Sequence, residues 1–237
     1  MSGAEDSWGR LYADLLSCRA CPRLVAWREE VARVKRRAYR EIEYWGRPVP
    51  SLGPVDARLL LVGLAPGAHG ANRTGRMFSG DESGRTLIPA LYRAGFANKP
   101  VFAGPGDGLE LHDAYITAVC HCAPPGNKPT AEEIGRCRPF LVRELGLLRE
   151  VRVVLALGRI GFDGFLKAIK ELGCDTPHLA FAHGGVYPLG AGLPTLVATY
   201  HPSRQNTNTG RLTEAMLDAV LERVRELVAG GGVKRSE

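Results

Sequence analysis

The sequence predicts an α/β fold: a three-layer sandwich with a central four-stranded parallel sheet flanked by helices. Four short runs are dense in Leu, Val and Ile, as strands buried in a parallel sheet are. These runs alternate along the chain with segments of helical periodicity, which is the pattern of a layered α/β domain. The expected strands are Arg58–Gly63, Tyr115–Val119, Val151–Leu157 and Leu196–Tyr200. The expected helices are Ser83–Gly95, Thr130–Arg149, Ile160–Leu172 and Thr213–Ala229.

The N-terminal part of the chain is predicted to be helical over residues 6–40. Leu11, Leu15 and Leu16 form one apolar face there, and a second helical segment begins at Pro22. Residues 44–54 hold three prolines and predict a loop. Farther along, Thr130-Ala-Glu-Glu is a capping box that fixes the start of its helix. We expect a single domain over residues 1–237, with residues 1–55 as an N-terminal helical segment.

The composition is that of an ordinary globular protein, with 45% hydrophobic and 24% charged residues among 237. Its longest apolar runs fall far short of the ~20 residues that cross a bilayer, and no secretory signal is visible. We expect a cytoplasmic protein with no membrane partner. The net charge is +6, and 25 of the 31 basic residues are Arg. Arginine suits phosphates and base edges, although genome composition or a hot habitat would also enrich it.

Ligands of such sheets bind beyond the carboxyl ends of the strands, so the segments that follow the strands are the candidate site. These segments are Leu64–Asp81, Cys120–Pro129, Gly158–Gly161 and His201–Gly210. Five of the six Asn and Gln residues of the chain lie within them. Amides there suit recognition of a base-like, donor–acceptor edge, whereas the alternative is that Asn simply favours turns.

The first of these loops, read from Gly63 to Asp81, is rich in glycine but matches no nucleotide-binding motif. Ala65 breaks the GxGxxG pattern, and the P-loop frame lacks its Lys and Ser/Thr. What remains is a loop whose backbone can approach a ligand closely. Phe78 could stack on a ligand or pack in the core. Asp81 could act as a general base, supply a negative charge or cap the following helix.

The fourth loop opens with His201, directly after an apolar strand. A histidine at a strand tip can donate a hydrogen bond to developing negative charge, or it can be a structural residue. The chain holds no GxSxG elbow and no HExxH pair, which removes the main support for a serine hydrolase or a zincin.

Six cysteines in a chain without a secretory signal indicate a metal site rather than disulfides. Cys18 and Cys21 form a CxxC pair, and two later cysteines would complete a tetrathiolate set. The spacing alone does not choose between Cys120 and Cys122, with Cys137 as a further ligand. Zinc is the commoner occupant of such a set, and an iron–sulfur cluster is the less common one. Cys174 is most simply an isolated thiol.

Four stretches taken together resemble the family 5 uracil-DNA glycosylases, iron–sulfur members of the uracil-DNA glycosylase superfamily. They are GLAPGAHGANRTGRMFSGD over residues 63–81, the CxxC pair, CAPPGNKPT from Cys122 and HPSRQNTNTGRLT from His201. The similarity runs from about Cys18 to Leu227. It implies a four-stranded parallel sheet and a [4Fe-4S] cluster remote from the chemistry, in place of zinc. The implied cluster ligands, which tie on the N-terminal segment, are Cys18, Cys21, Cys122 and Cys137.

The resemblance also implies an activity: hydrolysis of the N-glycosidic bond of uracil, and of other deaminated bases such as hypoxanthine, in DNA by base flipping. Phe78 would stack on the base, His201 would stabilise the departing base anion, and Asp81 would position water or balance an oxocarbenium-like sugar. The backbone that would shape the base pocket is that of Gly63, Leu64, Ala65, Pro66 and Gly67.

Other implied contacts lie farther out, and three positions depart from the family pattern. Asn127 would sit near the pocket rim, while Arg204 and Arg211 would contact DNA. Sister iron–sulfur glycosylases carry an acid at Leu64, superfamily members often carry Asn at Ala118, and Pro commonly stands at Met77. We therefore expect relaxed discrimination among bases. We also expect the protein to be a monomer. The alternative function is a noncatalytic, metal-stabilised nucleic-acid-binding module.

Overall fold

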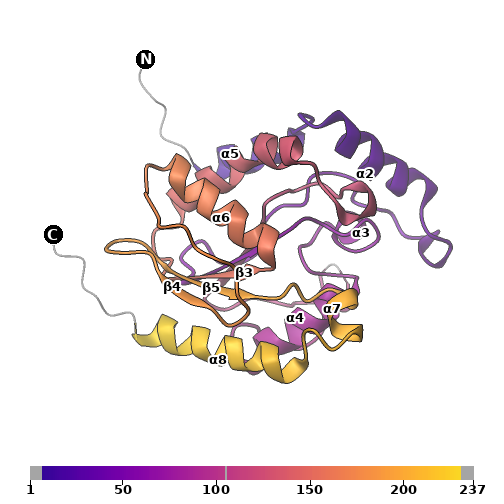
Figure 1. Ribbon diagram of the computed structural model, residues 1–237. Coiled ribbons are helices and arrows are strands. Elements are labelled where there is room, and N and C mark those ends of the chain that lie inside the picture. Colours follow the sequence, from indigo (N-terminus) through magenta and orange to yellow (C-terminus); the bar gives the residue numbers. More distant parts are fainter. Residues whose placement is uncertain (1–6, 105, 231–237) are drawn as a thin grey trace, which may run out of the picture.

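The computed structural model of the protein describes residues 7–104 and 106–230, so the ends of the predicted 1–237 domain lie outside the described residues. A sheet lies between two layers of helices (Figure 1). The helices are α1 (Trp8–Ser17), α2 (Pro22–Val34), α3 (Ala71–Thr74), α4 (Glu82–Arg93), α5 (Ala131–Leu147), α6 (Arg159–Glu171), α7 (Arg204–Asn208) and α8 (Glu214–Gly230). Two single turns of 3-10 helix are η1 (Arg37–Tyr39) and η2 (Pro125–Asn127).

Within the described residues the sheet has five strands, in the order β2-β1-β3-β5-β4. They are β1 (Leu59–Gly63), β2 (Ala114–Ala118), β3 (Val153–Leu157), β4 (Val186–Pro188) and β5 (Thr195–Thr199). The first four in spatial order are parallel, which confirms the predicted parallel sheet. The fifth strand, β4, pairs antiparallel with β5 at the edge and was not predicted. It is three residues long and contains a proline, so it carries no readable strand pattern.

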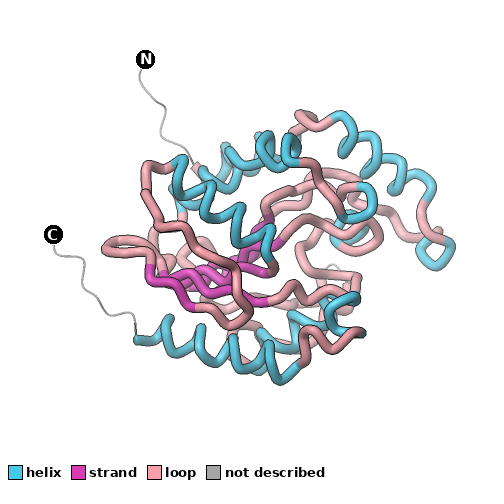
Figure 2. The backbone as a smooth tube through the Cα atoms, viewed as in Figure 1, coloured by secondary structure: helices cyan, strands magenta, loops and turns pink. Residues whose placement is uncertain are grey.

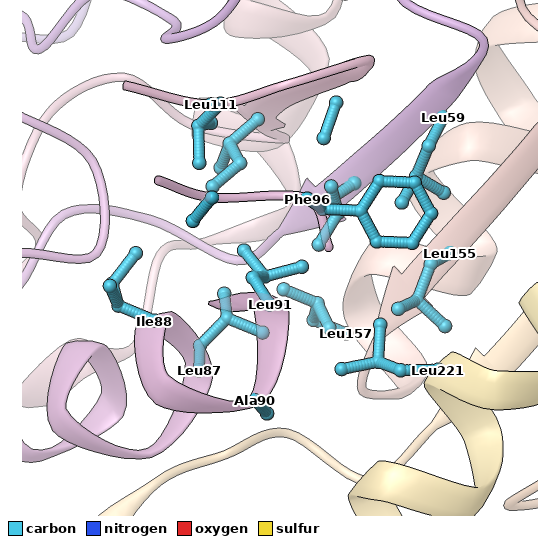
Figure 3. Packing of buried hydrophobic residues seen from close by; sticks show 14 of the residues in the cluster. Leu59, Leu87, Ile88, Ala90, Leu91, Phe96, Leu111, Leu155, Leu157 and Leu221 are labelled. Carbon is cyan, nitrogen blue, oxygen red and sulfur yellow. The ribbon is translucent and has the colours of Figure 1, made fainter. Parts of the chain in front are cut away.

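The parallel strands are buried on both faces because alternate side chains enter two separate cores. Leu59 and Leu61 pack in one cluster with apolar residues of α4 and α8. The close view of this cluster labels Leu59 together with Leu91 of α4 and Leu221 of α8 (Figure 3). Leu60 and Val62, on the opposite face, pack with Phe162 of α6. Helices therefore cover the sheet on both sides (Figure 2), which is the predicted three-layer arrangement.

The helix starts follow local sequence more closely than the ends do. Thr130 and Glu133 form the predicted capping box at the start of α5. In contrast, the prediction of helix through residue 40 is wrong beyond Val34. Lys35 takes a left-handed φ of 57°, which ends α2, and only the single turn η1 follows. No helix in the described residues is long and apolar enough to cross a membrane.

Candidate active site and metal centre

The loop that follows β1, Gly63–Asp81, turns back at the carboxyl edge of the sheet and carries the short helix α3. The carbonyl of Gly67 accepts hydrogen bonds from the amides of Gly70 (3.2 Å) and Asn72 (3.1 Å). The loop ends where Asp81 begins α4. Because the loop closes on itself in this way, its first five residues lie next to its last ones.

Asp81 uses its two carboxylate oxygens differently. Oδ1 accepts a hydrogen bond from the Gly84 amide at 3.0 Å and so caps α4. Oδ2 faces the loop: a Cβ added at Gly67 would lie 2.6 Å from it, and one at Gly70 would also collide with it. Burial is the largest influence on this carboxyl and raises its pKa above the usual range. Asp81 therefore caps α4 with one oxygen, and its second oxygen lies against the backbone of Gly67 and Gly70.

Phe78 and His201 meet at the other end of the same turn. The Phe78 ring lies against Gly63, where an added Cβ would come within 3.0 Å of Cε2 and Cζ. Its centroid is 6.1 Å from that of the His201 ring, at a tilt of 32°. Phe78 also packs against the core, and its φ is +50°, a strained value for a side chain of this size.

His201 is held by its backbone and is uncharged at neutral pH. Its carbonyl accepts hydrogen bonds from the Ser203 amide (2.7 Å) and from Asn206 Nδ2 (2.9 Å). Burial lowers the pKa of its imidazole to about 4. No group in the described part of the chain hydrogen bonds to the imidazole. A neutral imidazole with an uncommitted N–H can donate to a group that becomes negative during a reaction.

The stretch Gly63, Leu64, Ala65, Pro66 and Gly67 thus joins the two halves of the site. Phe78 lies against its first residue and Asp81 against its last. The Leu64 carbonyl accepts a hydrogen bond from the Cys120 amide at 3.1 Å, which fixes the stretch to the segment after β2.

The predicted outer contacts are spread more widely. Asn127 is exposed in η2 with a φ of +56°, and no contact joins it to Asp81 or His201. Arg204 is exposed at the start of α7. The Arg211 guanidinium lies 4.6 Å from the Tyr200 ring centroid.

Sequence reasoning missed three residues beside the site. Tyr200 stacks on His183, with ring centroids 4.9 Å apart and planes at 9°. Its place directly before His201 was a usable signal, but no motif marks His183. Arg73 binds the first loop internally, donating to the carbonyls of His69 (2.9 Å) and Gly80 (3.3 Å). Its partners are all backbone groups or distant in sequence, so no spacing pattern reveals it.

The four cysteines that the resemblance selects gather at a second place. They line one cavity together with apolar side chains of α2: Cys18, Cys21, Cys122 and Cys137. Cys120 does not line it, and all six thiols are free. Among the described residues, no three His, Cys, Asp or Glu side chains stand close enough to hold a single metal ion. Four thiolates are the donor set of a [4Fe-4S] cluster, in which each iron takes one cysteine, and also that of a tetrahedral zinc site.

Arg28 connects this cavity to the first loop. Its buried guanidinium donates to Cys122 Sγ at 2.8 Å and to the Cys18 carbonyl at 3.2 Å. Its own carbonyl accepts a hydrogen bond from Asn72 Nδ2 at 3.2 Å. Asn72 is fully buried within α3, so α2 links the cysteines to the loop that holds the candidate active site.

Comparison with known proteins identifies the family. Residues 50–225 match the uracil DNA glycosylase superfamily. A type-5 uracil-DNA glycosylase of Thermus thermophilus is 53% identical over 213 residues, which cover 90% of this chain and 94% of the relative. The chain belongs to the type-5 uracil-DNA glycosylase family.

Other relatives agree with this placement within the superfamily. A type-5 uracil-DNA glycosylase of Mycobacterium bovis is 50% identical, covering 96% of this chain and 84% of the relative. A type-4 uracil-DNA glycosylase of Pyrobaculum aerophilum is only 30% identical, over 81% of this chain and 87% of the relative. The resemblance to the family 5 uracil-DNA glycosylases that the sequence predicted is thus confirmed, and these glycosylases are the appropriate comparison for the site.

Proposed function

We propose that the protein excises uracil from DNA by hydrolysing the N-glycosidic bond. The observation that carries the proposal is that Phe78 and Asp81 lie against the two ends of the stretch Gly63–Gly67, with the uncharged His201 ring 6.1 Å from the Phe78 ring. The type-5 relatives are named as uracil-DNA glycosylases, which supports the same reaction.

In this proposal the target nucleotide leaves the duplex and its base enters the pocket at the carboxyl edge of the sheet. Phe78 stacks on the base, and the backbone of Gly63–Gly67 surrounds its edge. His201 donates an N–H to the base as negative charge develops on the leaving group. Asp81 Oδ2 orients the attacking water or stabilises the positive charge on the sugar.

The departures at Leu64 and Ala118 bear on the choice of base. With Leu at position 64, Asp81 is the carboxylate that the first loop supplies. Ala118 is buried at the end of β2 and offers no amide to select uracil. We therefore propose a substrate range that includes other deaminated bases such as hypoxanthine, with Asn127 at the rim of the pocket.

The rest of the domain supports this site. Arg204 and Arg211 are proposed to contact DNA beside the fourth loop, and one copy of the chain suffices for the reaction. We propose that residues 1–55 are held to the single domain by a [4Fe-4S] cluster on Cys18, Cys21, Cys122 and Cys137. Such a cluster supplies structural cross-linking there and no step of the reaction. We place the protein in the cytoplasm, where these thiols stay reduced.

The cofactor is tested by elemental analysis and by absorbance of the purified protein. About four irons and four sulfides for each chain, with a brown colour, are expected. Stoichiometric zinc in a colourless protein would overturn the cluster assignment but would leave the glycosylase proposal intact.

The activity is tested by single-turnover excision from a duplex with one uracil, followed by alkaline cleavage at abasic sites. Asp81→Asn keeps an N-cap side chain but removes the charge, so excision should fall by about 10²- to 10⁴-fold while stability is retained. His201→Gln should reduce excision with DNA affinity unchanged. Binding without any abasic product in the wild-type protein would favour the noncatalytic module instead.

A further inference from the structure

The segment that follows α2, residues 35–47, runs beside the active-site loop instead of continuing the helix. In Figure 1 the chain beyond α2 turns at the end of the molecule that carries α3 and α7. This is the carboxyl edge of the sheet, where the candidate site lies. None of the residues proposed to act on the base or to hold the cluster lies in this segment.

Two sets of contacts hold the segment against the first loop. The Arg73 guanidinium lies 4.1 Å from the ring centroid of Tyr39, within cation–π distance. Farther along, the Trp45 amide donates to the Arg73 carbonyl at 3.0 Å, and the Tyr44 hydroxyl is 3.1 Å from His69 Nδ1. Both parts of the segment are therefore fixed relative to Asp81, because Arg73 is also bound to Gly80.

The arginines of this segment are exposed and, within the described chain, lack acidic partners. No described residue forms an ion pair or a hydrogen bond with the guanidinium of Arg36, Arg37, Arg40 or Arg47. Lys35 donates to the Arg40 carbonyl at 3.3 Å, and the Arg47 guanidinium lies 5.5 Å from the Trp45 ring centroid. Some exposed arginines on regular helices do have acidic partners: Arg33 pairs with Glu30, and Arg223 with Glu226.

The segment is also positive overall. Lys35 and the four arginines give five cations against two acids, Glu41 and Glu43, a net charge of +3. Burial and then the charges of Arg36 and Arg73 lower the pKa of His69, so this positive field reaches the first loop. Like charges held together repel one another unless an anion lies between them.

We propose that residues 35–47 form a DNA-binding element in which Arg36, Arg37 and Arg40 contact backbone phosphates next to the extruded nucleotide. The guanidinium fork pairs with phosphate oxygens, and these arginines already stand at the edge where the base must enter. This inference rests on the proposed function for the identity of the partner as DNA. It extends the contact surface from Arg204 and Arg211 to the opposite side of the first loop.

The test compares two triple variants that each lose three positive charges. The first is Arg36→Gln/Arg37→Gln/Arg40→Gln. The matched control is Lys167→Gln/Lys170→Gln/Arg225→Gln, whose exposed cations lie in the second halves of α6 and α8 and form no ion pair with a described residue. Both should melt at the wild-type temperature, because the substituted side chains make no packing contacts in a core.

Affinity for an undamaged duplex is measured by fluorescence anisotropy over a range of salt. Loss of three phosphate contacts should reduce the magnitude of the slope of log K, where K is the association constant for DNA, against log salt concentration by about 2.7. The ratio of the wild-type K to that of the first variant should therefore fall about 40-fold between about 50 and 200 mM salt. The control variant should keep the wild-type slope. Equal slopes in the two variants would overturn the proposal.

Excision is measured on the same variants to separate the two proposals. With enzyme in saturating excess at low salt, the rate constant of the first variant should equal that of the wild type, since its arginines do not touch the base. A protein that removes no uracil would refute the proposed function, yet the salt slopes would still decide whether this segment binds DNA. A lowered saturating rate constant at an unchanged slope would also overturn the inference.

Discussion

Substitution of Gly67 by Ala tests whether the position of Asp81 determines the rate of excision. The added Cβ would lie 2.6 Å from Asp81 Oδ2, whereas ordinary contact begins at 3.4 Å, so the oxygen must move by about 0.8 Å. A misplacement near 1 Å costs about 10²-fold in rate when geometry controls a reaction. We expect single-turnover excision to fall about 100-fold. Loss of the cap bond to Gly84 would add a destabilisation of about 0.5–2 kcal/mol.

Two further variants show whether this loss acts through Asp81. Gly146→Ala in α5 is the control, because no atom lies within 4 Å of its added Cβ. It should excise at the wild-type rate and gain up to about 1 kcal/mol of stability. In an Asp81→Ala background, Gly67→Ala should lower the excision rate by less than about 3-fold, because both changes act through the Asp81 carboxylate. Wild-type excision by Gly67→Ala, or a full 100-fold loss in the Asp81→Ala background, would refute the reasoning.

Two other predictions concern His201 and Phe78. His201 takes up a proton near its ordinary pKa of 6.5 in the unfolded chain, but its pKa in the folded chain is about 4. The free energy of unfolding therefore decreases as the pH falls from about 6.5 to about 4. Denaturant titrations should show the wild type losing about 3 kcal/mol more than His201→Gln between pH 7 and pH 4, and equal losses would contradict the buried, neutral state. Phe78 has a φ of +50°, which glycine adopts without strain. The free energy of unfolding of Phe78→Gly should therefore exceed that of Phe78→Ala by about 1 kcal/mol in denaturant titrations. The reverse order would show that the backbone at this position relaxes.

The parallel strands could be predicted because their signal lies within the sequence itself. Leu59–Gly63 is apolar throughout, and a buried parallel strand requires that. Cysteine spacing left Cys120 and Cys122 open, and only the family resemblance selected Cys122, which lines one cavity with Cys18, Cys21 and Cys137. Asp81 was recognisable as a cap, but the use of its second oxygen depends on the turn at Gly67–Gly70, which only the structure shows.

The segment after α2 shows why the rest could not be predicted. Its residues, KRRAYR, have good helix propensity, and the sequence therefore predicted helix to residue 40. Tertiary contacts of Tyr39 with Arg73 and of Tyr44 with His69 accompany a single turn of 3-10 helix and an irregular path instead. Those partners are more than 20 residues away, so no local pattern reports them.

The cysteine cavity has a consequence for the chain in its unfolded state. Any group that bridges Cys21 and Cys122 closes a loop of about 100 residues, and a cross-link of that span removes chain entropy equivalent to about 5 kcal/mol. Strands β1 and β2 and the whole first loop, with Asp81, lie inside that closed loop, whereas His201 lies outside it. In the unfolded bridged chain, the half of the site that holds Asp81 is thus confined to a closed loop, whereas the half that holds His201 is free of that constraint and loses more chain entropy when it folds.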